Sequence, residues 1–226
     1  MSDTIKVYES GKTRIRIERD ENPIHPWILN DMASSLAAWN EDCSYLPYTG
    51  NEKAQKKLNE QYQFIESHDD MQAWIDDAKN AHRPYLVFGW THFDKYGGVV
   101  LHTNNNKGVD QNDLEQFDGA LFIDEERFRE YVDSKTQMSD ATMEARMVDV
   151  LQAEFDQLNA YASGCCFGFV LEKKCPTCGQ WEIKDSVWGY ECLQPEGSKE
   201  WREMCMAMLE NIDSDIVGIT KQMLGE

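Results

Sequence analysis

The most distinctive local motif in this sequence is Cys175-Pro176-Thr177-Cys178-Gly179. In a Cys-x-x-Cys turn followed by glycine, two thiolates can reach one metal ion, as in one half of a structural zinc site. Such a site needs four ligands, and the chain holds no second Cys-x-x-Cys motif. The remaining ligands would come from Cys43, Cys205, a histidine or another subunit. Two alternatives stay open: a redox pair, which lacks the strand–motif–helix context of thioredoxin-like sites, and a plain turn without metal.

A second group of chemically capable residues consists of His92, Asp94 and His102. Alternate residues of a strand face the same side, so His92 and Asp94 can act as a pair. A histidine beside a carboxylate serves as a general base or as a metal ligand. The alternative is a hydrogen-bonded turn aspartate beside partly exposed histidines. Because serine nucleophile elbows, phosphate loops and His-Glu-x-x-His are absent from the sequence, we predict that the protein is not an enzyme.

The third feature is an acidic segment, Asp110–Asp156, which contains 14 acidic and four basic residues and so carries −10. Duplex DNA carries one charge per roughly 1.7 Å of its axis, and carboxylates on a folded surface can imitate part of that field. The alternative is a solvated acidic face without a partner. The candidate partner-binding residues lie in the centre of this segment. They are Asp118, Asp124, Glu125, Glu126, Glu130 and Asp133.

Composition limits the class of protein. The 226 residues carry a net charge of −19, from 41 acidic and 22 basic side chains. This charge repels nucleic acid and anionic membranes, so basic proteins are the expected partners, although solubility or a salt-adapted host explains it as well. Seven cysteines, including the adjacent Cys165 and Cys166, argue for a reducing cytosol rather than a disulfide framework. The sequence has no signal-peptide pattern and no apolar run as long as a membrane span, so we expect a cytoplasmic protein.

Periodicity predicts the elements that position these residues. Alternation and turn residues predict a hairpin at the N-terminus, three short strands in the middle and two strands around the Cys-x-x-Cys turn. These strands are expected at 4–9, 13–19, 85–90, 98–101, 120–123, 165–171 and 181–190. Residues 27–39 are compatible with a helix or with a strand around Ser35–Trp39. Asp124 is expected to cap a helix that carries Glu125 and Glu126 in its first turn.

Together these elements predict a single α+β domain spanning residues 1–226. Its mainly antiparallel sheet is expected to be covered by two long helices, at 139–163 and 198–223. Residues 51–81 carry two helical patterns between strands, so we interpret them as an inserted helical hairpin within this domain.

Several short motifs, spread over most of the chain, resemble an uncharacterised family of bacteriophage and mobile-element proteins. The family pattern contains I-R-I-E-x-D-E, D-H-S-G-I, W-D-S-G, Y-G-F-V and D-S-x-W-G. The matching pieces are I-R-I-E-R-D-E at 15–21, D-K-Y-G-G-V at 94–99, F-D-G-A-L-F-I-D at 117–124, Y-A-S-G at 161–164, F-G-F-V at 167–170 and D-S-V-W-G at 185–189. The chain departs from the pattern at the D-H-S-G histidine, where Lys95 or Tyr96 stands, and at the W-D-S-G tryptophan, where Phe117 stands. The resemblance implies a viral or mobile-element protein working in a bacterial cytoplasm, and it implies no reaction.

Two hypotheses of function follow. The first is an acidic inhibitor that binds a basic, nucleic-acid-handling host defence protein, such as a restriction or CRISPR component, by mimicking nucleic acid. It needs no cofactor and no direct contact with nucleic acid or membrane. The second is a zinc-stabilised regulator or metal-dependent enzyme that uses Cys175 and Cys178 together with His92 and Asp94. The sequence leaves the oligomeric state open, a dimer included.

Overall fold

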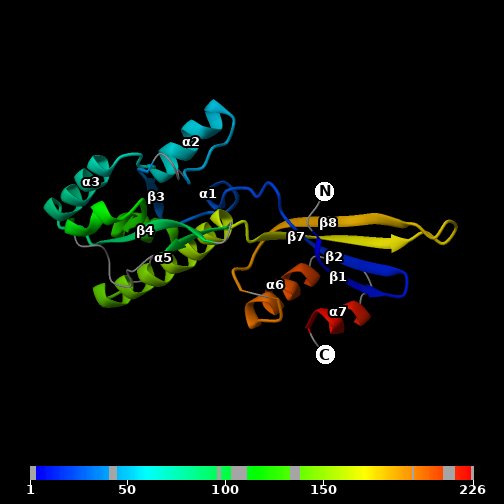
Figure 1. The fold of residues 1–226 in the computed structure, drawn as a ribbon. Helices are drawn as coiled ribbons and strands as arrows, with labels where there is room; N and C mark the ends of the chain where they lie inside the picture. The colour runs from blue at the N-terminus through cyan, green and yellow to red at the C-terminus, as the bar shows by residue number, and fades with distance from the viewer. Residues whose placement is uncertain are drawn as a thin grey trace. The chain divides into compact units, whose positions relative to one another are not determined.

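The chain divides into two compact units (Figure 1). The computed structural model describes residues 4–40, 45–95, 98–102, 111–132, 138–194, 196–210 and 217–224. Unit 1 combines residues 1–24 with 164–226, and unit 2 spans 25–163. This division differs from the single domain expected over 1–226. Each unit has its own sheet and its own hydrophobic core, and a hydrophobic pattern along the chain does not say which strands share a sheet.

Unit 1 is an antiparallel four-stranded sheet with two helices on one face (Figure 1). Its strands, in spatial order, are β1 (Thr4–Ser10), β2 (Thr13–Arg19), β7 (Cys166–Lys174) and β8 (Trp181–Glu191). The predicted N-terminal hairpin is confirmed, with Gly11 at φ +63° in the turn, a backbone conformation that glycine adopts without steric cost. The second hairpin, β7–β8, carries the Cys-x-x-Cys turn at its tip.

Alternation along β2 separates the two faces of this sheet. Ile15 and Ile17 are fully buried beneath the helices, whereas Arg14 and Arg16 lie on the opposite face and pair there with Glu172 of β7. In place of the one helix expected over 198–223, the structure has two, α6 (Lys199–Glu210) and α7 (Val217–Leu224). These two helices pack against each other, which the ends of one straight helix cannot do, because it rises about 1.5 Å per residue.

Glu191, at the end of β8, makes the stability of unit 1 depend on pH. Burial raises the pKa of Glu191 from the ordinary 4.5 to about 7. The folded state therefore binds the proton more tightly than the unfolded state, and stability falls as pH rises from about 4.5 to about 7. We expect Glu191→Gln to be more stable than the parent by about 1–2 kcal/mol at pH 8 and equal to it near pH 4. Urea unfolding at the two pH values measures this difference. An equal effect at both would contradict the assignment.

Unit 2 is a second antiparallel four-stranded sheet, with helices on both faces. Its strands, in spatial order, are β3 (Ser35–Ala38), β6 (Gly119–Asp124), β4 (Tyr85–Lys95) and β5 (Gly98–His102). Its helices are α1 (Pro26–Leu29), α2 (Glu52–Tyr62), α3 (His68–Asn80), the 3-10 helix η2 (Gln111–Gln116), α4 (Glu125–Tyr131) and α5 (Asp140–Ala162). The fold class is thus α+β with antiparallel sheets, as predicted, but with two sheets in place of one.

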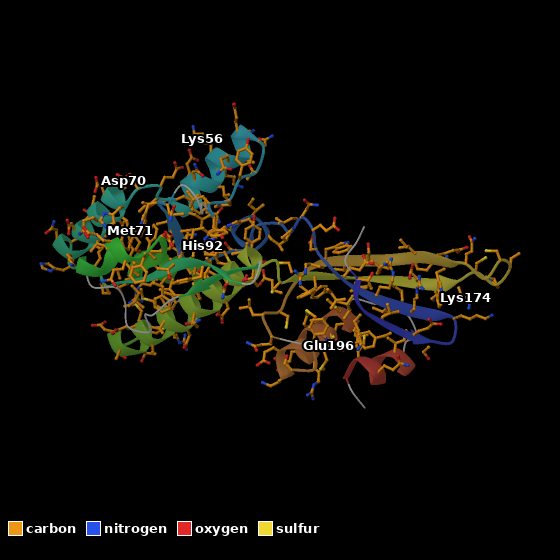
Figure 2. The ribbon with its side chains drawn as sticks, in the orientation of Figure 1. Lys56, Asp70, Met71, His92, Lys174 and Glu196 are labelled. Carbon is orange, nitrogen blue, oxygen red and sulfur yellow. The ribbon has the colours of Figure 1, made fainter. Side chains whose placement is uncertain are left out.

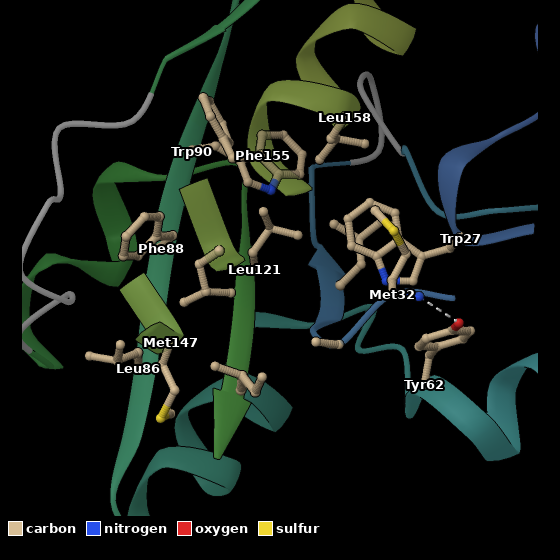
Figure 3. Packing of buried hydrophobic residues seen from close by; sticks show 14 of the residues in the cluster. Trp27, Met32, Tyr62, Leu86, Phe88, Trp90, Leu121, Met147, Phe155 and Leu158 are labelled. Atoms are coloured by element: carbon tan, nitrogen blue, oxygen red, sulfur yellow. Dashed lines mark hydrogen bonds between the residues drawn. The ribbon is translucent and has the colours of Figure 1, made fainter. Parts of the chain in front are cut away.

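The main core of unit 2 lies between its sheet and α5 (Figure 3). Phe88 and Trp90 of β4 and Leu121 of β6 meet the buried side of α5 there. That side carries buried apolar residues at spacings of three and four, namely Met143, Met147, Leu151, Phe155 and Leu158. On the other face, Met71 and Ile75 of α3 pack with residues of the sheet. The expected helical insertion at 51–81 therefore contributes to the core of unit 2.

Candidate partner-binding site

Helix α4 forms where the sequence predicts it, because Asp124 caps its first turn. Asp124 Oδ1 accepts a hydrogen bond from Arg127 N at 2.9 Å, and Arg83 donates to Asp124 Oδ2 at 2.7 Å. Phe128 turns the other side of the helix into the core. Asp124 is only 8% exposed, so its carboxylate stabilises α4 rather than an external contact.

Asp118 also faces inward, at the turn before β6. Its Oδ1 accepts from the Asn40 side chain and its Oδ2 accepts from His92 N, both at 2.7 Å. These two bonds hold β4 and the segment after β3 against the turn. Asp118 and Asp124, both predicted to contact a partner, are therefore engaged within unit 2.

Three of the remaining predicted residues lie along the solvent side of α4. Glu126 and Glu130 are exposed, and Glu125 is partly exposed. Glu125 accepts a hydrogen bond from Arg129 at 2.7 Å, and a Glu130 oxygen lies 4.0 Å from Arg127 Nη1. Asp133, the sixth predicted residue, lies outside the described residues. The exposed acidic set of α4 is thus Glu125, Glu126 and Glu130.

Glu126 and Glu130, but not Glu125, line a groove of about 510 Å³ that also reaches two earlier helices. Glu60 of α2 and Asp77 of α3 line the groove together with Glu126 and Glu130 of α4. Glu60 and Asp77 precede α4 by dozens of residues and were not among the predicted partner-binding residues. In the sequence, each of these two residues is only an acidic residue on the polar side of an amphipathic helix. Such residues are common on solvated helices, so this pattern does not mark them as part of a binding site.

Two arginines in the same groove are already engaged with protein groups. Arg83 forms ion pairs with Asp77 and Asp124. Arg127 donates to the carbonyls of Ala33 and Met32 at 3.1 and 3.3 Å, and its guanidinium lies 5.0 Å from the centre of the Tyr62 ring. Among the residues that line the groove, the acidic side chains outnumber these two arginines. The groove therefore presents negative charge to solvent, and we call Glu60, Asp77, Glu126 and Glu130 the acidic rim.

His92 has a defined structural environment in unit 2 (Figure 2). Its Nδ1 lies 2.7 Å from the Tyr45 hydroxyl, and the two rings are stacked with centroids 5.8 Å apart. The side chains of Asp94 and His102 lie outside the described residues, so the predicted pairing of His92 with Asp94 stays a prediction. Within the described part of the chain, no three His, Cys, Asp or Glu side chains gather into a metal-binding group.

The Cys-x-x-Cys motif forms a closed turn at the tip of the β7–β8 hairpin. Cys175 N donates to the carbonyl of Gln180 at 2.7 Å, and Gly179 N donates to that of Cys175 at 2.9 Å. Cys175 Sγ accepts hydrogen bonds from the backbone N–H groups of Cys178 and Thr177, which lower the pKa of the Cys175 thiol below its ordinary value. This motif belongs to unit 1, whereas His92 belongs to unit 2.

Searches against models of known families, curated proteins and solved structures found no match for this chain. In the described ranges, no helix is both long enough and apolar enough to cross a lipid bilayer.

Proposed function

We propose that this protein is an acidic inhibitor that binds a basic, nucleic-acid-handling protein by occupying its nucleic-acid-binding surface with the acidic rim. The resemblance to phage and mobile-element proteins makes a bacterial defence protein the expected target, met in the host cytoplasm. One observation carries the proposal: exposed carboxylates from α2, α3 and α4, far apart in sequence, line one groove. In this role the protein acts without a catalytic step, by binding alone.

Carboxylates arranged around a groove suit a basic partner for two reasons. Each carboxylate that meets an arginine or lysine adds a charge-assisted hydrogen bond. The negative field also steers a basic protein toward the groove, so association is expected to be fast and to weaken steeply as salt rises. Single exposed ion pairs contribute only about 0–1 kcal/mol, so the four carboxylates would act as a set.

The test is a triple charge reversal, Glu60→Lys with Glu126→Lys and Glu130→Lys. Asp124 is left intact because it caps α4, and Asp77 because it pairs with Arg83. The target is first isolated from a bacterial lysate with the full chain, and its affinity is then measured with purified proteins by titration calorimetry. We expect the triple variant to bind about 10–100-fold more weakly, because three favourable contacts become repulsive.

A matched control makes the same change in charge on unit 1. Glu200, Glu203 and Glu210 are exposed on α6, and replacing all three by lysine alters net charge equally. This control is expected to bind the target with nearly unchanged affinity. Equal weakening by both triple variants would mean that net charge alone drives binding. Binding that survives the first variant, or that DNA and RNA fail to compete away, would exclude mimicry by the acidic rim.

The second candidate function is a zinc-stabilised regulator, and the closed turn around Cys175 and Cys178 is the observation that favours it. The other form of this candidate is a metal-dependent enzyme that also uses His92 and Asp94. Metal analysis of the purified chain separates the candidates: stoichiometric zinc that is required for activity favours the regulator, whereas activity without metal excludes it.

A further inference from the structure

The tip of the β7–β8 hairpin has the backbone geometry of one half of a thiolate metal site. Two backbone hydrogen bonds close the turn, one from Cys175 N to the carbonyl of Gln180 and one from Gly179 N to that of Cys175. Gly179 at φ +74° closes the turn in the left-handed region, where a side chain would be strained. The closed turn therefore brings Cys175 and Cys178 to the same end of the hairpin.

A zinc ion held by this turn needs two further ligands. Structural zinc is almost always bound by four ligands in tetrahedral geometry. In the described part of the chain, no third His, Cys, Asp or Glu completes a group around Cys175 and Cys178. The tip is at the free end of its hairpin, beyond the turn of the β1–β2 hairpin (Figure 1), and Cys178 is exposed. A second identical tip can therefore approach and supply the same two thiolates.

The charge near the tip favours such an approach. Two chains that each carry −19 repel one another over most of their surfaces. At the tip, however, Lys173 and Lys174 directly precede Cys175, and Lys174 N donates to the carbonyl of Lys12 at 2.8 Å (Figure 2 labels Lys174). A zinc ion with four thiolates carries a net charge of −2, which these lysines offset. Glu182 lies at the tip too, where it hydrogen-bonds to Cys175 and pairs with Lys184, so the lysines outnumber this one carboxylate beside the thiols.

We propose that Cys175 and Cys178 from two copies of this chain bind one zinc ion as a four-thiolate site that joins the hairpins tip to tip. The proposal is independent of the inhibitor function, since the acidic rim belongs to unit 2 and the tip to unit 1. Each thiol loses its proton when the metal binds, so assembly releases protons and weakens at low pH.

The test uses the reduced, full-length chain with added Zn²⁺, and with Co²⁺ as a spectroscopic probe. Light scattering after gel filtration is expected to show a dimer with zinc and a monomer after chelation. Metal analysis should give about half a zinc ion per chain, and Co²⁺ should give the intense absorption of a tetrahedral thiolate site. Cys175→Ser and Cys178→Ser should each abolish both the dimer and the stoichiometric metal.

Two control variants keep the test specific. Thr177→Ala changes the same turn without removing a thiol or a backbone N–H, and Cys165→Ser removes a thiol outside the tip. Both are expected to dimerise with zinc like the parent. The proposal is overturned by a monomer that binds one zinc ion per chain, by a dimer that survives Cys178→Ser, or by a reduced chain that takes up no zinc.

Discussion

Replacing Phe88 by alanine is expected to lower the free energy of unfolding of unit 2 by about 3–5 kcal/mol. Phe88 is 0% exposed and lies opposite Leu121 in the β4–β6 pair, within the core that α5 covers (Figure 3). Removing the ring deletes buried apolar contacts and leaves a cavity, because close-packed neighbours relax only in part. Urea unfolding followed by circular dichroism measures the loss.

The control for this substitution lies five residues along the same strand. Phe93 is 52% exposed, so Phe93→Ala removes far less buried surface and is expected to cost under about 1 kcal/mol. If the two variants unfolded at the same urea concentration, Phe88 would not lie in the packed core between the sheet and α5.

The second large effect concerns a buried carboxylate on α5. Glu154 is 4% exposed, and its two oxygens accept hydrogen bonds from the backbone N–H groups of Ala33 and Ser34, at 2.5 and 2.9 Å. These bonds hold the segment that leads into β3. Burial raises the pKa of Glu154, while the two donors and Arg127 oppose that rise.

Glu154→Ala is expected to destabilise unit 2 by about 3–5 kcal/mol. The substitution leaves two buried N–H groups without acceptors, at about 1–3 kcal/mol each, and adds a small cavity. Glu154→Gln should fall between the parent and alanine, because an amide keeps one acceptor oxygen and presents an N–H₂ group to the other donor.

Glu144 provides the comparison for Glu154 on the same helix. Its side chain is exposed, so Glu144→Ala should change stability by less than about 0.5 kcal/mol. Differential scanning calorimetry of all three variants checks the order. A Glu154→Ala protein as stable as Glu144→Ala would mean that the two backbone donors find other acceptors.

The sequence alone determined the strands and helix ends that depend on residues close together in the chain. The alternation at Ile15 and Ile17 is sufficient to predict β2, since the period of two places every second residue on one face. Asp124 caps α4 as expected, because an N-cap bonds to a backbone group within three residues. Ser139 caps α5, where the sequence allowed either Ser139 or Asp140. Gly164 follows the end of α5 in the left-handed region, at φ +63°, a position where glycine commonly ends a helix.

Tertiary structure alone decided how these elements combine. β3 was ambiguous because its four residues are all buried, so no alternation distinguishes it from a helix. The two sheets arise from pairings between strands far apart in the chain, such as β2 with β7, which local periodicity does not encode. The sequence likewise does not show which acidic residues face the interior and which line the groove. Asp118 and Asp124 turn inward because Asn40, His92 and Arg83 reach them from distant segments, while Glu60 and Asp77 join Glu126 only because three helices meet at one groove.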